Sequence, residues 1–89
     1  MPNFVPITYE KAIAINPGYA KAHHNKGLAL KEQGQLDDAL ESYDKAIQLR
    51  PDNAIAYGNK GLALRLLNRW DASIESYKKA LEIDPELEL

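Results

Sequence analysis

The chain has 89 residues, of which 45% are hydrophobic and 27% are charged, an ordinary composition for one small globular domain. Its formal net charge of −2 argues against nucleic-acid binding, which usually requires a strongly basic face. No apolar run reaches the roughly 18 residues of a membrane-spanning helix, and the first residues lack the pattern of a secretory signal. The chain contains no cysteine, so disulfides are excluded and a cytoplasmic location is only the default expectation.

A repeat of 34 residues runs through the sequence. Prolines stand at positions 17, 51 and 85, and tyrosines keep the same step at positions 9, 43 and 77. The run Lys26–Leu30 returns unchanged as Lys60–Leu64. Because a unit of this length cannot bury its apolar face alone, the sequence predicts a stack of like units.

The first helix is predicted over residues 6–15. A proline at its first turn is tolerated because its missing N–H would have no partner there, and Pro17 stops the helix. A second helix is predicted from Ala20 to about Gln33, where small and apolar residues recur at helical spacing. Gly34 then supplies the left-handed conformation that often ends a helix.

The third helix is predicted to open at Asp37 and Asp38, whose charges favour the positive end of the helix macrodipole. It ends before Pro51, because the residue before a proline disfavours helical geometry. The pattern then returns over residues 54–67 and 71–84, with Asn68 in place of the turn glycine. Short turns between the five helices predict that neighbours are antiparallel.

This spacing resembles that of the tetratricopeptide repeat, which places small, aromatic and proline residues at fixed positions on two helices, A and B. The resemblance implies an all-α, right-handed solenoid of antiparallel helical hairpins in the order B, A–B, A–B. One domain over residues 1–89 would then hold a half repeat at 6–17 and full repeats at 20–53 and 54–87. The residues that carry the resemblance are Gly27, Ala39, Tyr43, Ala46, Pro51, Gly61, Tyr77, Ala80 and Pro85.

No catalytic or metal-binding pattern is present in the sequence. His23 and His24 are adjacent, so on a helix they point about 100° apart, whereas chelation on a helix favours a spacing of four residues. The serines at 42, 73 and 76 lie on predicted B helices with no histidine placed to activate them. We therefore predict a protein without enzymatic activity, bound metal or cofactor.

Charge separates between the two kinds of helix. The first A helix carries three lysines against Glu32, and the second carries Lys60 and Arg65 with no acid, a net charge of +2 each. The B helices at 37–50 and 71–84 each carry four acids against two bases. In tetratricopeptide arrays the A helices line the concave face, so the resemblance implies a basic groove. Alternatively, the two kinds of helix only complement each other within the stack.

The function that we expect is a protein-interaction module whose groove binds an extended peptide, either acidic or ending in a free carboxylate. Asn25 and Asn59 occupy equivalent places, and in related arrays such asparagines hold a peptide backbone. The set resembles, incompletely, the carboxylate clamp that holds chaperone tails. The partner is thus a protein or peptide, with no nucleic acid and no membrane. The predicted groove residues are Lys21, His24, Asn25, Leu28, Lys31, Ile55, Asn59, Leu62 and Arg65.

Neither end resembles the polar caps that repeat arrays normally carry. We therefore expect a fragment of a longer array, and the alternative function is self-assembly into a homo-oligomer through apolar end faces. In the competing interpretation Phe4 and Val5 cover the first helix and the C-terminal leucines cover the last. The predicted self-association residues are Leu66, Leu67, Trp70, Tyr77, Leu81 and Ile83.

Overall fold

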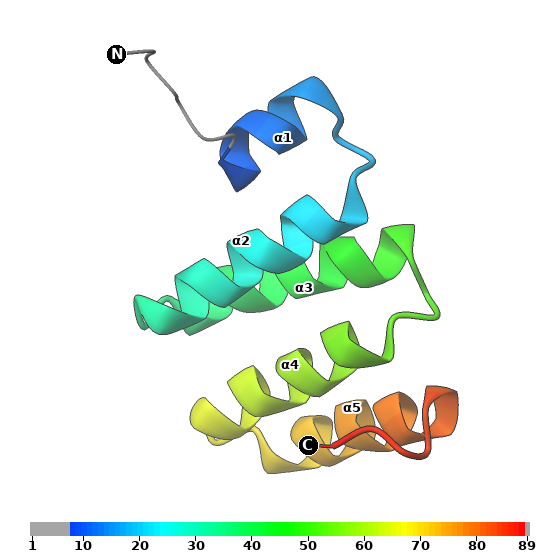
Figure 1. The fold of residues 1–89 in the computed structure, drawn as a ribbon. Helices are drawn as coiled ribbons and strands as arrows, with labels where there is room; N and C mark the ends of the chain where they lie inside the picture. Colours follow the sequence, from blue (N-terminus) through cyan, green and yellow to red (C-terminus); the bar gives the residue numbers. More distant parts are fainter. Residues whose placement is uncertain (1–7, 89) are drawn as a thin grey trace.

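The computed structural model describes residues 8–88. Within them it contains five α-helices and no strand, which confirms the predicted all-α helical-repeat solenoid. Figure 1 shows α2 with α3 and α4 with α5 as two hairpins in successive layers, with α1 at the other end of the stack from α5. The helices are α1 (Tyr9–Ile15), α2 (Ala20–Glu32), α3 (Leu36–Leu49), α4 (Ala54–Leu66) and α5 (Trp70–Ile83).

The turns and helix starts follow local chemistry. Gly34 has φ 80° and Asn68 has φ 61°, so the turn within each hairpin uses the left-handed region, as predicted. The Thr8 hydroxyl accepts a hydrogen bond from the Lys11 backbone N–H at 3.2 Å and caps α1. The Asn53 side chain caps α4 in the same way and accepts a hydrogen bond from the Ala56 backbone N–H at 3.1 Å.

Several boundaries differ from the predicted ones. Helix α1 begins at Tyr9 rather than near residue 6, because Thr8 adopts extended backbone and serves as its N-cap. The helix start was predicted at residue 6, and Phe4 and Val5 were predicted to cover the first helix. These residues lie outside the described residues. Helices α3 and α5 each begin one residue early, so Trp70 belongs to the first turn of α5 instead of the preceding loop.

The hydrophobic core lies between α3 and α4. Ala39, Tyr43 and Ala63 are fully buried, and the Tyr43 ring also lies directly against Gly27 of α2. A Cβ atom added to Gly27 would stand 2.5 Å from that ring, closer than two carbon atoms can approach. The glycine therefore allows α2 to pack onto α3 while the tyrosine fills the space toward α4.

The second hairpin repeats this arrangement. A Cβ atom added to Gly61 of α4 would stand 2.9 Å from the Tyr77 ring of α5. Ser73 replaces the alanine found in the first hairpin, and its buried hydroxyl donates a hydrogen bond to the Gly61 carbonyl at 2.7 Å. That bond satisfies the serine in an apolar surrounding, so the substitution leaves the hairpin packed.

Candidate functional site

The two A helices form one side of the stack. The backbones of α2 and α4 lie close to each other, whereas those of α3 and α5 do not approach each other within residues 8–88. The stack therefore curves with α2 and α4 on its inner side. We call the surface that carries Lys21 and His24 of α2, and Asn59 and Arg65 of α4, the inner face.

A hydrogen bond crosses the inner face between the two repeats. Asn59 Nδ2 lies 2.8 Å from His24 Nε2, and the amide donates when that ring nitrogen is unprotonated. The His24 ring also packs edge-on against Tyr43, with centroids 5.8 Å apart and planes at 88°. Burial lowers the pKa of His24 below its ordinary value of 6.5, which favours the neutral ring that this bond requires.

Two hollows lie along the inner face. The first has a volume of about 350 Å³ and the second of about 520 Å³. They bring together six of the nine residues predicted for the groove. The first hollow is lined by Ala20, Lys21, His24, Arg50, Asp52 and Asn53. The second is lined by Ile55, Gly58, Asn59, Leu62, Arg65, Tyr77, Leu87 and Glu88.

The other three predicted residues line neither of these two hollows. Leu28 packs against the hydrophobic core, Lys31 is half-buried, and Asn25 is exposed. The predicted equivalence of Asn25 and Asn59 is therefore incomplete. Asn59 meets a histidine on the preceding A helix, whereas the described chain places only the short B helix α1 ahead of Asn25.

Cross-repeat ion pairs account for part of the charge separation. Lys60 Nζ lies 2.6 Å from Asp44 Oδ1, and Arg69 pairs with Asp37 at 3.0 Å. Both pairs join the second hairpin to α3 of the first, so here basic and acidic groups complement each other within the stack. The ion pairs of the described residues do not include the predicted groove cations Lys21, Lys31 and Arg65.

Comparison with known proteins identifies the family. Residues 24–88 match the model of the tetratricopeptide repeat. The chain belongs to the tetratricopeptide repeat family. A crystal structure of MamA is 36% identical with a TM-score of 0.83, covering 88% of this chain and 46% of that one. This chain therefore spans about half the length of that relative. A search of curated proteins found no match.

Two further tetratricopeptide structures share the fold. The Arabidopsis OM64 domain is 26% identical with a TM-score of 0.87, and the match covers 90% of this chain and 66% of that one. The first such domain of Spaghetti (RPAP3), bound to the HSP90 peptide SRMEEVD, is 22% identical with a TM-score of 0.86. That match covers 89% of this chain and 63% of the other, and at this identity it speaks for the fold alone.

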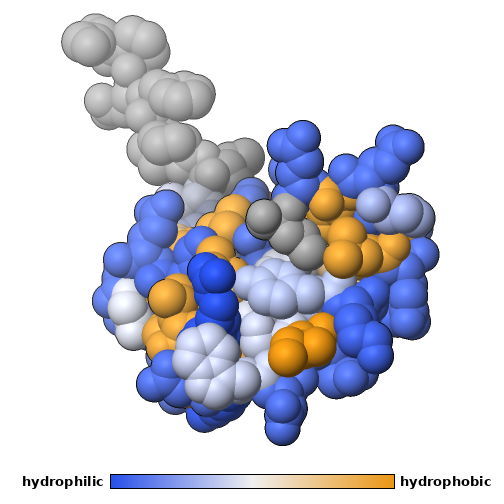
Figure 2. Space-filling model, turned by 90° about the horizontal axis from the view of Figure 1, so that it is seen from below, coloured by the Kyte–Doolittle hydropathy of each residue, from blue (hydrophilic) through white to orange (hydrophobic). Residues whose placement is uncertain are grey.

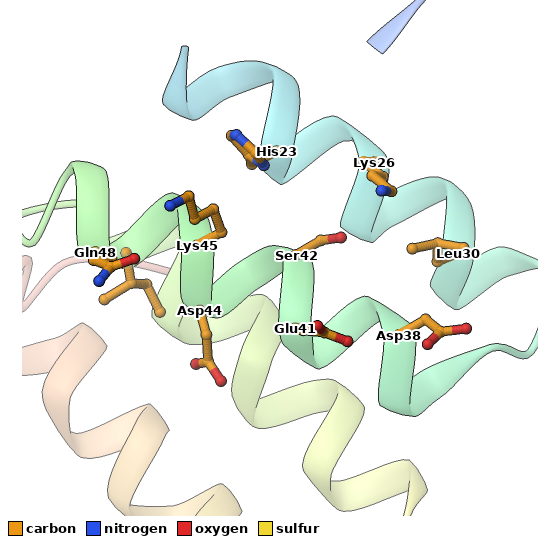
Figure 3. Close-up of a pocket in the computed structure, with 10 residues that line it drawn as sticks. His23, Lys26, Leu30, Asp38, Glu41, Ser42, Asp44, Lys45 and Gln48 are labelled. Atoms are coloured by element: carbon orange, nitrogen blue, oxygen red, sulfur yellow. The ribbon is translucent and has the colours of Figure 1, made fainter. Parts of the chain in front are cut away.

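A larger cleft of about 840 Å³ lies between α2 and α3, away from the inner face (Figure 3). It brings His23 and Ser42 to one cleft, a proximity that the sequence had not indicated. The His23 ring nitrogen, however, lies 2.9 Å from the Pro17 carbonyl oxygen, and no hydrogen bond of the described residues joins it to a serine. Within the described residues, His23 and Ser42 thus do not form the hydrogen-bonded pair in which a histidine activates a serine.

Residues 8–88 contain neither a metal-binding cluster nor a membrane-spanning helix. No group of three or more histidine, aspartate or glutamate side chains is arranged to hold a metal ion there. No helix in this part of the chain combines the length and apolar character that a membrane crossing demands.

Helix α5 forms the end of the stack that lies away from α1 (Figure 1), and its outer surface carries exposed apolar side chains. We call this surface the end face. Trp70, Ile74 and Leu81 are 57%, 55% and 40% exposed, and Leu66 at the end of α4 is 53% exposed. Figure 2 shows this end of the stack, where apolar patches alternate with polar side chains. The other predicted self-association residues, Leu67, Tyr77 and Ile83, are only half-buried.

Sequence reasoning missed Ile74 as a member of the end face. Its counterpart one repeat earlier is Leu40, which is 8% exposed in the core shared with α4. The 34-residue step would have identified Ile74 as the counterpart of Leu40, a side chain that the next helix along the chain covers.

Proposed function

We propose that the chain is a protein-interaction module that binds an extended peptide along the inner face. The observation that carries the proposal is the convergence of successive repeats on one surface. His24 and Asn59 meet there across 2.8 Å, and a hollow lies on each side of the contact. Tetratricopeptide repeats are a protein-interaction fold, and a surface built by two repeats can hold a ligand that neither repeat could hold alone.

An acidic ligand fits the charge of this face best. Lys21 and Arg50 line the first hollow beside Asp52. Arg65 lines the second beside Glu88, so cations outnumber acids in the two hollows. Of these cations, Lys21 and Arg65 belong to the A helices. The peptide bound to the Spaghetti domain, SRMEEVD, is itself rich in acidic residues. For the present chain we propose a ligand with carboxylates at the same spacing as these two cations.

Selection from a displayed library of random octapeptides on the full chain tests this proposal. We expect enrichment of acidic sequences that lose binding when Lys21→Gln and Arg65→Gln are combined. The matched control combines Lys45→Gln and Lys79→Gln, which removes the same charge from exposed positions of α3 and α5. Selected peptides that bind both double variants as well as the unchanged chain would contradict an acidic ligand on the inner face.

Self-association is the second candidate function, and the exposed apolar residues of the end face favour it. Head-to-tail stacking of copies would repeat the contact between α3 and α4, in which Lys60 pairs with Asp44. In such a stack α5 of one copy would pack on α2 of the next, as α3 packs on α4 within the chain. Lys78, which stands 34 residues after Asp44, would then face Lys26, which stands 34 residues before Lys60, and the two lysines would repel each other. We therefore propose a two-fold pairing of end faces for any oligomer of this chain.

Light scattering over a hundredfold concentration range tests self-association. The two-fold arrangement predicts a dimer that dissociates when Ile74→Arg and Leu81→Arg are introduced together. A mass near 10.0 kDa for the unchanged chain at every concentration would contradict it.

A further inference from the structure

The two hollows differ at several equivalent positions, among them the one that His24 occupies in the first repeat. Gly58 of α4 stands 34 residues after His24 of α2. In the first repeat the imidazole packs against the Tyr43 ring, which is fully buried. In the second repeat the glycine contributes no side chain, and the half-buried Tyr77 ring lines the hollow. The wall of the second hollow therefore has no side chain at the position that the imidazole occupies in the first repeat.

The walls of the second hollow indicate which ligand group it suits. Ile55, Leu62 and Tyr77 supply apolar surface, and Asn59 adds an amide. Arg65 is the one cation among the residues that line it. An aliphatic side chain next to a carboxylate would therefore bury apolar area and face a guanidinium at the same time.

The chain itself places such a pair of residues beside the hollow. Leu87 and Glu88 both line it. Leu87 is half-buried there, whereas Glu88 is exposed, and the ion pairs of the described residues do not join it to Arg65. Two hydrogen bonds between near neighbours in the sequence turn the segment after α5. The Asp84 side chain accepts from the Glu86 backbone N–H, and the Asp84 carbonyl accepts from the Leu87 backbone N–H, each at 3.1 Å. Figure 1 shows this segment running back across the second hairpin.

We propose that the second hollow is a binding subsite for a leucine followed by an acidic residue, supplied by a partner peptide. The inference rests on the proposed function and specifies the ligand of the inner face. Leu87 and Glu88 act as an intramolecular competitor, because a partner peptide must displace them. A tethered competitor has a high effective concentration, so its removal strengthens binding by about tenfold or more.

Fluorescence anisotropy with a labelled pentapeptide, Asp-Pro-Glu-Leu-Glu, tests the subsite. The peptide copies residues 84–88 and is capped at both ends, so that no free carboxylate contributes. We expect weak binding to the intact chain and binding about tenfold tighter to a vacated variant that carries Leu87→Ser and Glu88→Gln. The same peptide with its leucine changed to serine should bind neither protein.

Filling the hollow should remove this binding. Gly58→His, added to the vacated variant, restores the side chain of the first repeat and should weaken binding by about tenfold or more. The matched control is Ala72→His, which places an imidazole on the exposed surface of α5 and should change nothing. Replacing a glycine inside α4 does not weaken the helix, and circular dichroism checks that each variant is folded.

A second arm does not depend on filling the hollow. Arg65→Gln in the vacated variant should weaken binding of the acidic peptide severalfold. It should leave the uncharged Asn-Pro-Gln-Leu-Gln peptide unaffected. If neither Gly58→His nor Arg65→Gln changes binding of the peptide, the proposed subsite is wrong. The proposal that ligands bind on the inner face would then still stand. Absence of binding to the folded vacated variant would also overturn the subsite, whereas the proposed function is judged by the library selection.

Discussion

Leu40 in the first hairpin is 8% exposed, whereas its counterpart Ile74 in the second hairpin is 55% exposed. Ala46 and Ala80, another equivalent pair, are both 0% exposed. No described helix follows α5, so Ala80 is buried by its own hairpin, whereas burial of Leu40 depends on α4. Side chains between the two helices of a hairpin are thus buried by the hairpin itself, whereas side chains on its outer surface are buried only by a neighbouring repeat.

The largest difference between the hairpins should appear when the core tyrosine is removed. Tyr43→Ala should cost about 3–5 kcal/mol of unfolding free energy, because α2 and α4 both pack on the ring and leave it 0% exposed. Tyr77→Ala should cost clearly less, since none of the helices in residues 8–88 covers that half-buried ring as α4 covers Tyr43. Urea unfolding measures both losses. Equal losses would show that α4 does not contribute to the burial of Tyr43.

The glycines beneath these tyrosines give the next largest effect. Gly27→Ala should destabilise the chain by about 1–3 kcal/mol, since its Cβ atom would meet a Tyr43 ring that cannot move. Gly61→Ala should be nearly neutral. The Tyr77 ring can shift outward there, and alanine gains about 1 kcal/mol of helix propensity over glycine. Thermal melts of the two variants decide this, and a greater loss at Gly61 would refute the argument.

The contact between the repeats should respond to pH. Burial lowers the pKa of His24 below 6.5, so the unfolded chain takes up a proton more readily than the folded chain. The stability that the neutral ring contributes is complete above pH 6.5 and is lost as the pH falls through the lower folded pKa. His24→Gln should reduce the fall in melting temperature between pH 7.5 and pH 5, and the control His23→Gln should not. An unchanged fall in the His24 variant would speak against this role.

The smallest effect is expected for the ion pair between the hairpins. Lys60 and Asp44 are partly exposed, so a double-mutant cycle of Lys60→Met and Asp44→Asn should give a coupling of less than about 1 kcal/mol. High salt should weaken it further. Lys26→Met, at the equivalent position of the first hairpin, should change stability less, because no ion pair of residues 8–88 includes Lys26. A coupling that salt leaves unchanged would contradict this interpretation.

Much of the fold could be predicted from the sequence because its signals are local. Gly34 and Asn68 marked the turns, and helical spacing accounts for the four predicted residues of α4 that line one hollow. The bond between His24 and Asn59 could not be predicted, because it joins side chains 35 residues apart whose meeting depends on how the hairpins stack. The sequence does show that Gly58 departs from the repeat, but only the fold places Tyr77 beside it.

The start of α1 shows why local signals can also mislead. Pro6 is compatible with a first helical turn, but a threonine that can accept a hydrogen bond at an N-cap is a stronger start signal than a tolerated proline. Likewise, Trp70 lies in the first turn of α5 although the acidic residue after it suggested a later start.

Ligand binding, in our proposal, belongs to the inner face and not to the end face or to the cleft between α2 and α3. Amide NMR shifts of the full chain, titrated with the acidic octapeptide most enriched in the library selection, test it most directly. We predict shifts that cluster at Lys21, His24, Asn59 and Arg65. Shifts that cluster instead around Trp70 and Ile74, or around His23 and Ser42, would contradict the account.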